Sequence, residues 1–364
     1  MRQHTISNFQ AILLLTSMMV GLGVQQNLAD AGSDFWLAML IGWAVGYVVM
    51  LLVAALSALH PGQCLVGILI ECLGKTAGRV VGILCAAAFL FTAGDVIQQF
   101  GYYEITIEIP ETPLIFITAC YALVIAFAVR TGLETLGRIG EVFFPVLCAV
   151  VLITMASLFT SFHSIAFLPV LKSGWVKPVS VGLRVGMLPF ASVVAALAIF
   201  PNMTEPKKVF HVVNMTSLLT GICETAIVFR NIMVTGVQLS SRNIFPYEKV
   251  FRLMPGIDVY PLLDLDVMMS GILAGGVLLF AAVRTLGEIF HLEKFQIFTL
   301  PAVALAVSAS QVYLNTLYHQ REATFFLALY LMPALCGLCV ILLAISLLRP
   351  ANAPPAVPSS GTHT

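Results

Sequence analysis

Charged residues are scarce in this chain of 364 residues. Only 10% are Asp, Glu, Lys or Arg, and 18 basic residues balance 18 acidic ones, so the formal net charge is zero. Nucleic-acid-binding proteins show a basic excess, and we therefore expect no nucleic-acid partner. Hydrophobic residues make up 59% of the chain, and the mean hydropathy is +0.98, far above soluble domains. The composition predicts an all-α protein that crosses the lipid bilayer several times.

The chain also lacks the motifs of catalysis and cofactor binding. It has no phosphate-binding loop, and its seven histidines lie at span ends or in loops without a recognisable catalytic partner. Of eight cysteines, Cys336 and Cys339 have metal-like spacing, but one such pair cannot complete a tetrahedral site. We expect no enzyme activity, no cofactor and no metal, and we interpret the cysteine pair as helix packing.

Ten runs are long and apolar enough to span a membrane, which takes about 20 residues. They lie at 9–29, 35–58, 79–102, 113–129, 141–160, 178–200, 210–236, 266–288, 296–316 and 324–348. The first run leads directly into the second, so a cleavable signal peptide is not expected. The segment 350–364, rich in Pro, Ser and Ala, is expected to be disordered.

Basic residues indicate the orientation, because Lys and Arg accumulate in cytoplasmic loops. Clusters at 75–79, 130–138 and 207–208 fall on one side, and the short loops at 30–34 and 103–112 on the other side carry only acids. We predict a multi-pass protein of the cell membrane with both termini in the cytoplasm.

Two hydrophobic runs are interrupted in matching places. Gly21-Leu22-Gly23-Val24 breaks the first run, and Gly186-Met187-Leu188-Pro189-Phe190 breaks the sixth. Matched breaks in two halves indicate the substrate site of an inverted-repeat transporter, although a pair of kinks is the alternative. We predict two five-helix repeats, 1–160 and 161–349, with a ligand site near the midplane. Free N–H groups at the first break would suit a ligand carboxylate.

A polar stripe marks the third run. Asp95, Gln98, Gln99 and Tyr102 follow one another at i, i+3, i+4 and i+7, so they share one helix face that avoids lipid. They either contact a ligand or bond to a neighbouring helix. An ionised Asp95 needs a partner in hydrocarbon, and Arg184 or a ligand ammonium would supply one.

Glu224 and Arg230 lie in the seventh run. Six positions separate them, so they face different directions and are not expected to pair. Glu224 either lines an ion or proton path, together with Asp95, or is a structural acid. Arg230 and Arg184 could extend towards the surface along their long side chains.

Several segments together resemble one family. They are Ile6-Ser-Asn-Phe-Gln10, Ala31-Gly-Ser-Asp-Phe-Trp-Leu37, Pro61-Gly62, Leu73-Gly-Lys75, Gly78-Arg79, Thr112-Pro113, Arg130-Thr-Gly-Leu-Glu-Thr-Leu-Gly-Arg-Ile-Gly-Glu141 and Phe143-Phe-Pro145. Their order and spacing resemble the spore germination permease family, the membrane-embedded B subunits of nutrient germinant receptors. In the longest block, Arg130, Glu134 and Arg138 would form a charge ladder if the segment is helical.

The resemblance implies a fold similar to the amino acid–polyamine–organocation transporters, with broken first and sixth helices. It also implies partner A and C subunits, a small nutrient germinant as ligand, and the inner membrane of the spore. Family members often carry Pro-Phe-Gly-Glu at the sixth break. Here the stretch is Pro189-Phe-Ala-Ser192, so this chain lacks the carboxylate to which a proton-linked role would fall.

Three functional hypotheses follow. The first is a germinant-sensing subunit whose ligand, an amino acid or similar metabolite, binds between the first, third, sixth and eighth spans and triggers ion release. The second is a secondary amino-acid transporter coupled to protons or cations. The third is a scaffold that assembles partner subunits.

The predicted topology has a direct test. Cysteines placed near Asp34, Glu108 and Arg252 should react with a membrane-impermeant reagent added outside, because these loops are predicted to be external. Cysteines near Arg138 and Lys207 should be protected. External labelling at Lys207 would overturn the arrangement of five plus five helices.

Overall fold

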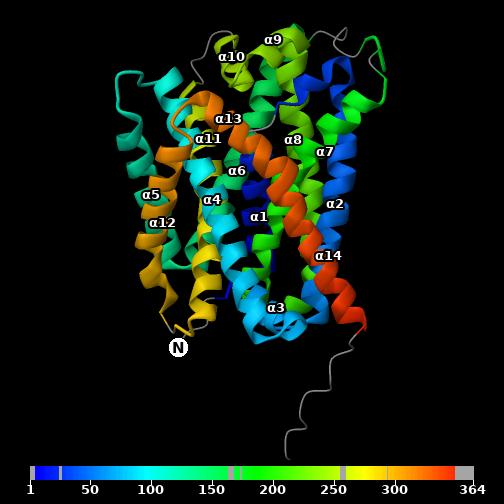
Figure 1. Ribbon diagram of the computed structural model, residues 1–364. Helices are drawn as coiled ribbons and strands as arrows, with labels where there is room; N and C mark the ends of the chain where they lie inside the picture. Colours follow the sequence, from blue (N-terminus) through cyan, green and yellow to red (C-terminus); the bar gives the residue numbers. More distant parts are fainter. Residues whose placement is uncertain are drawn as a thin grey trace, which may run out of the picture.

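The computed structural model describes residues 5–23, 27–162, 168–172, 174–254, 260–292 and 294–348, and in these ranges it is a bundle of helices (Figure 1). The helices that build the bundle are α1 (Asn8–Gly23), α2 (Phe35–Leu59), α3 (Leu65–Leu73), α4 (Lys75–Ile107), α5 (Leu114–Thr131), α6 (Leu133–Leu158), α7 (Val176–Ala191), α8 (Val209–Thr235), α9 (Val237–Arg242), α10 (Pro246–Arg252), α11 (Tyr260–Ile289), α12 (Thr299–Tyr313), α13 (Leu317–Phe326) and α14 (Met332–Leu348). Val24 and the predicted disordered segment 350–364 lie outside the described residues.

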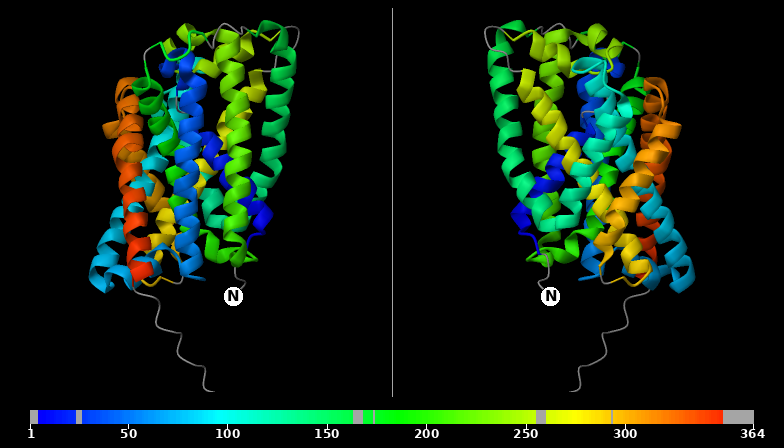
Figure 2. Two further views of the ribbon diagram at one scale, coloured as in Figure 1. Left: turned by 90° about the vertical axis from the view of Figure 1, so that its right-hand side faces the viewer. Right: turned by 90° about the vertical axis from the view of Figure 1, so that its left-hand side faces the viewer.

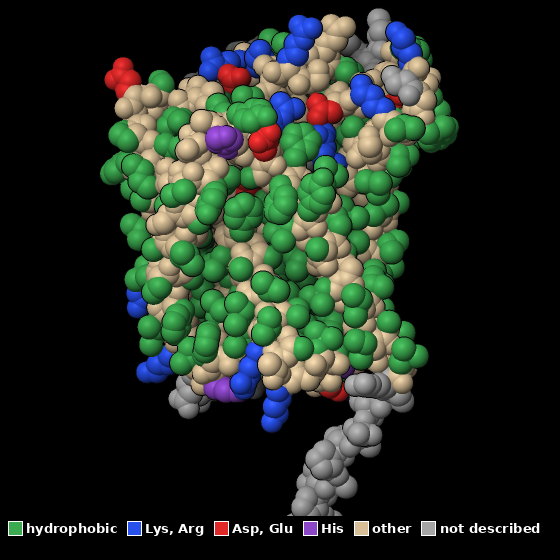
Figure 3. Space-filling view, viewed as in Figure 1, with side chains coloured by type: hydrophobic (Ala, Val, Ile, Leu, Met, Phe, Trp, Pro, Cys, Tyr) green, Lys and Arg blue, Asp and Glu red, His purple; other side chains and the backbone are tan. Residues whose placement is uncertain are grey.

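The two ends of the bundle are distinct. Short helices α9, α10 and α13 cover one end, called the α13 end, and α3 lies at the other, called the α3 end (Figure 1). Hydrophobic side chains cover the middle of the visible face, and charged side chains gather at both ends (Figure 3). Such a belt is what a bilayer requires of a spanning protein.

Nine segments of the described chain are long and apolar enough to cross a membrane, and each overlaps one of the predicted runs from the second to the tenth. The first run forms the shorter helix α1. The chain is therefore a multi-pass membrane protein, as predicted. A short helix, α3, lies between the second and third runs and was not predicted.

Helix α1 lies inside the bundle (Figures 1 and 2). Every residue from Ala11 to Leu22 is buried, and α1 packs against α6, α7, α8 and α11. These neighbours come from both predicted repeats. The interrupted end of α1 is thereby enclosed by protein, which a broken helix in hydrocarbon requires.

The α3 end is closed around the start of α1. The backbone N–H of Ile6 donates to the carbonyl of Asn202 at 3.0 Å, and the Thr204 N–H donates to the Ile6 carbonyl at 3.0 Å. Gln10 Nε2 donates to Glu141 Oε2 at 3.0 Å, which joins α1 to α6. Gly140 of α6 allows this approach, since a Cβ there would lie 3.0 Å from Leu14 Cα.

The second break lies later in the chain than predicted. Residues 186–190 are part of α7, and the α-helix gives way to a 3-10 segment, η4 (Ser192–Ala198), only after Ala191. Gly182 and Gly186 instead face α2, where Cβ atoms would collide with the backbone of Ala38 and Gly42. These glycines therefore serve close helix packing, as small residues often do in membranes.

The predicted charge ladder is half formed. Arg138 Nη2 lies 2.6 Å from Glu134 Oε1 within α6. Arg130 belongs to α5, because Gly132 has φ of 108° and separates the two helices. An L residue rarely adopts this left-handed region, so the glycine ends the helix and takes Arg130 out of the ladder.

Two glycine substitutions test the packing of α2 on α7. Gly186→Ala should lower the apparent unfolding temperature of the purified protein, because overpacking a tight contact costs about 1–3 kcal/mol. Gly337→Ala in α14 is the matched control, since a Cβ there meets nothing within 4 Å. It should be neutral or stabilising, by up to about 1 kcal/mol. Equal unfolding temperatures for both variants would contradict the close contact.

Candidate functional site

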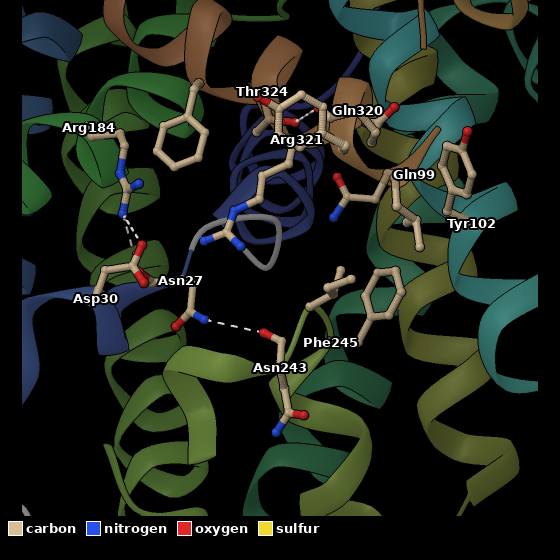
Figure 4. Close-up of a pocket in the computed structure, with 14 residues that line it drawn as sticks. Asn27, Asp30, Gln99, Tyr102, Arg184, Asn243, Phe245, Gln320, Arg321 and Thr324 are labelled. Carbon is tan, nitrogen blue, oxygen red and sulfur yellow. Dashed lines mark hydrogen bonds and ion pairs between the residues drawn. The ribbon is translucent and has the colours of Figure 1, made fainter. Parts of the chain in front are cut away.

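A cavity of about 320 Å³ opens at the α13 end of the bundle. Its walls come from the segment after α1, from α4 and α7, from the loop after α9, and from α13 (Figure 4). Asn27 anchors two of these walls, because its Nδ2 donates to the Ser240 carbonyl at 2.8 Å and its Oδ1 accepts from the Ala29 N–H at 3.0 Å. The cavity is therefore built by elements from both predicted repeats.

Two guanidinium groups and one carboxylate line this cavity. Arg184 Nη2 lies 2.7 Å from Asp30 Oδ2, and the guanidinium is centred 4.4 Å above the ring of Phe325. The Nε of Arg184 is buried without a hydrogen-bond partner in the part of the chain described. Arg321 approaches the same ring at 5.7 Å and reaches into the cavity (Figure 4). The cavity thus carries one more positive than negative group, which favours an anionic group on a ligand.

Asp95 is fully buried and does not belong to the cavity wall. Its Oδ1 accepts from Gln320 Nε2 at 2.7 Å, and both of its carboxylate oxygens lie 3.4 Å from Thr324 Oγ1. These bonds join α4 to α13. The proposed pairing of Asp95 with Arg184 is wrong, because Asp30 lies closer to Arg184 in the folded chain.

The other three members of the polar stripe have different roles: Gln98 bonds to neighbouring segments, whereas Gln99 and Tyr102 line the cavity. Gln98 is fully buried, donates from Nε2 to the Leu314 carbonyl at 3.1 Å, and accepts from Gln311 Nε2 at 3.1 Å. Tyr102 donates to the same Leu314 carbonyl at 2.8 Å while lining the cavity. Gln99 lines both this cavity and a small hollow beside Gly21. The stripe faces protein as predicted, but Gln99 is the member best placed to contact a ligand.

The glycines of the first break lie at close helix contacts. A Cβ on Gly21 would lie 2.7 Å from the Ser270 carbonyl oxygen of α11, and a Cβ on Gly23 would overlap the Glu224 carboxyl group. Leu22 between them is fully buried. Gly21, Leu22 and Gly23 are all part of α1, Val24 lies outside the described residues, and Asn27 has an extended backbone. The α-helix is therefore interrupted before Asn27, but the three described residues of the predicted break are helical.

The predicted residues of the sixth run fall elsewhere. Gly186, Phe190 and Glu224 line a second cavity of about 200 Å³ between α2, α7 and α8. Ser192 is fully buried, and its Oγ donates to the Leu188 carbonyl at 2.6 Å. Pro189 is buried inside α7 and lines neither cavity. The residues predicted to form one site therefore line two separate cavities or, like Pro189 and Ser192, neither of them.

Arg230 and Glu224 do not pair, as predicted. Arg230 donates from Nη1 to Thr154 Oγ1 at 2.7 Å and from Nε to Asn231 Oδ1 at 3.1 Å. It is 3% exposed, so the expectation that it reaches the surface is wrong.

Within the described ranges, no three His, Cys, Asp or Glu side chains gather as a metal site would require.

Sequence reasoning missed Asn27, Asp30, Arg321 and Phe325 as site residues. Asp30 and Arg321 flank apolar runs, a position that is typical of loop charges. The signal that could have found Arg321 and Phe325 is the amphipathic composition of 317–326, which carries both polar and aromatic residues ahead of a purely apolar stretch. Such a segment suits a helix that lies over a cavity.

Comparisons with known proteins agree with this fold. The sequence model of a family described as "Spore germination protein" matches residues 5–317. Spore germination protein KB of Bacillus subtilis (strain 168) is 28% identical over 251 residues, which are 67% of this chain and 66% of that protein. Spore germination protein YndE of the same organism is 24% identical over 323 residues, covering 85% of this chain and 81% of that protein.

A solved structure shares the fold. Mhp1, a nucleobase-cation-symport-1 family transporter in a closed conformation with bromovinylhydantoin bound, superposes with a TM-score of 0.71 at 12% identity. The match covers 96% of this chain and 81% of that one. The predicted fold class, an all-α inverted-repeat transporter fold, is confirmed, and both family and fold are those of permeases rather than enzymes.

Adjacent glutamines on α4 provide a test of the divided stripe. Gln98→Leu should destabilise the protein by about 1–3 kcal/mol, because it removes the hydrogen bonds that the buried Gln98 makes to the Leu314 carbonyl and the Gln311 amide. Gln99→Leu should change stability by about 0.5 kcal/mol or less, since its side chain faces a cavity. Thermal unfolding of the two purified variants measures the difference. A larger loss for Gln99→Leu would reverse the assignment.

Proposed function

The chain belongs to the spore germination protein family, and on that premise we propose that it is the membrane subunit of a nutrient germinant receptor. A small polar nutrient of amino-acid size binds in the cavity at the α13 end. The subunit works with A and C partner subunits in the inner membrane of the spore, and binding leads to ion release and germination. The α13 end faces outward in the predicted orientation, towards arriving nutrients.

The shape of the bundle carries this proposal. The α13 end is open through a cavity of about 320 Å³, whereas the α3 end is closed by the contacts of Ile6 and Gln10. A ligand can therefore enter from one side and is held in the membrane-embedded part. A cavity with a few convergent polar groups among aromatic rings is the usual form of a small-molecule site.

The chemistry of the cavity suits a nutrient with a carboxylate. The Arg321 side chain extends into the cavity (Figure 4). The Nε–H of Arg184, which also lines the cavity, is a donor without a partner in the described residues. Guanidinium groups bind carboxylates through charge-assisted hydrogen bonds. Gln99 adds an amide group for the polar part of the ligand, and Phe325 and Tyr102 cover its apolar part.

Binding is coupled to the bundle through α13. This helix carries Arg321 into the cavity, and its Gln320 and Thr324 hold Asp95 of α4. A ligand that bonds to Arg321 favours the arrangement in which α13 stays docked on α4. Such a ligand shifts an existing equilibrium only if it prefers one state, and this geometry gives it that preference.

The rival function is a proton- or cation-coupled amino-acid transporter. The superposition with Mhp1 supports it, because that protein is a transporter with the same fold. In this reading, the predicted five-helix units, 1–160 and 161–349, would rock around the cavity, and Asp95 and Glu224 would line the ion path. Reconstituted protein distinguishes the two, since a transporter accumulates substrate in vesicles without partner subunits and a sensor binds without accumulation.

Substitution of Arg321 tests the nutrient cavity. A strain lacking this gene is first screened for the amino acid to which its spores no longer respond. Restoring the gene with Arg321→Gln should then require about tenfold more of that nutrient for half-maximal germination, because one charge-assisted hydrogen bond is lost.

Arg242→Gln is the matched control, since Arg242 is exposed at the same end and lies outside the cavity. It should restore the wild-type response. An unchanged response in Arg321→Gln, with normal abundance in spore membranes, would remove this cavity as the nutrient site. Gradient-driven uptake by the isolated wild-type protein would favour the transporter.

A further inference from the structure

The second cavity, of about 200 Å³, lies between α2, α7 and α8 and shares no lining residue with the cavity at the α13 end. Its walls are largely apolar, and they include the aromatic rings of Trp36, Trp43, Phe190 and Phe229. Among the residues that line it, Glu224 is the one that can carry a charge. An acid facing an apolar chamber inside a membrane is costly and generally functional.

The Glu224 carboxyl group has an incomplete environment. Its Oε1 is buried and has no hydrogen-bond partner in the described part of the chain. It packs against Gly23 of α1, where a Cβ would overlap it. A buried carboxyl group without a hydrogen-bond partner is costly in apolar surroundings. A cation that pairs with it removes that cost, so this environment favours a cation.

The lining favours an organic cation over a metal ion. Hard metal ions take about six oxygen ligands, whereas the side chains here offer one carboxyl group. The Thr225 hydroxyl is engaged, since it donates to the Gly221 carbonyl at 2.5 Å. Aromatic faces attract organic ammonium groups through cation–π interactions. The other lining side chains are mostly apolar, so they can contact the hydrocarbon part of such a ligand.

The entrance lies within the apolar belt. Helices α2 and α8 pack against each other and lie side by side in Figure 2. Leu40 of the cavity wall is 46% exposed, and Ile222 of α8, one turn from the cavity residue Thr225, is 57% exposed. These side chains face hydrocarbon, so a ligand can enter the chamber from the bilayer.

We infer that this cavity is a binding site for a lipophilic organic ammonium ion, whose head pairs with Glu224 and whose hydrocarbon body lies among Trp43, Phe190 and Phe229. Because the head contacts the end of α1 and the body lies between α2, α7 and α8, occupancy stabilises the present packing of these helices. The site is separate from the nutrient cavity and does not depend on the function proposed above.

Tryptophan fluorescence reports on this site directly. The chain has three tryptophans, of which Trp36 and Trp43 line the cavity and Trp175 is 59% exposed outside it. The test uses full-length Trp175→Phe protein in phosphatidylcholine nanodiscs, titrated with hexylammonium, hexan-1-ol and hexanoate. Hexylammonium should shift the emission saturably, and the other two should bind at least about tenfold more weakly, because they lack the charge-assisted bond.

Three variants define the role of the carboxyl group. Glu224→Gln should weaken hexylammonium about tenfold and leave hexan-1-ol unchanged, since the neutral amide retains the shape. Glu224→Asp should keep the preference for the ammonium but favour octylammonium over hexylammonium. The Asp side chain is one methylene shorter, so its carboxylate lies nearer to the α8 backbone and a longer ligand is needed to reach it and still fill the cavity. Glu322→Gln, an exposed acid of α13 outside the cavity, should match the parent protein.

The alternatives predict different titrations. Equal binding of hexylammonium and hexan-1-ol would show a non-selective groove filled by lipid and would overturn the assignment. Unchanged hexylammonium affinity in Glu224→Gln would also overturn it. If Glu224→Gln does not fold, the chain-length preference of Glu224→Asp decides: the same preference as the parent would exclude Glu224 as the partner of the head group.

Discussion

A helix that ends inside a membrane must be surrounded by protein, and the whole bundle follows from this requirement. Every residue of α1 from Ala11 to Leu22 is buried, and Asn27, beyond the described part of this helix, has an extended backbone. Backbone groups freed by such an interruption cannot face lipid. Four helices pack around α1, and one cavity is lined by Asn27 while the other is lined by Glu224, which contacts Gly23. The two proposed ligand sites therefore adjoin one interruption.

The membrane spans were predictable because a long apolar run has one physical explanation, burial in the bilayer. A glycine within such a run has two explanations. Gly23 and Gly186 both lie within α-helices, α1 and α7, although both were predicted to mark breaks. A missing side chain permits either an open backbone or the close approach of another helix. The difference depends on the neighbour, and the neighbour of Gly186 is Gly42, 144 positions earlier in the chain. Sequence spacing alone carries no information about such a contact.

The candidate site was predictable only where it depends on a single helix. The stripe on α4 was correctly expected to face protein, because helical periodicity places its members on one side. Which member meets a ligand depends on α13, whose Gln320 binds Asp95 and leaves Gln99 to the cavity. The partner of Arg184 was missed for a similar reason, since Asp30 is brought to it by a turn that no periodicity describes.

The central place of α1 has a consequence for biogenesis. This helix is synthesised well before its neighbours α6, α7, α8 and α11. Asn8 binds the carbonyl of Glu205, 197 residues further along, and a ribosome needs roughly 10 to 40 s to add that length. During this time Thr16 and Ser17, both fully buried in the finished protein, have none of their later neighbours. Helix α1 thus leaves the ribosome long before its native surroundings exist, and it depends meanwhile on the insertion machinery or the bilayer surface.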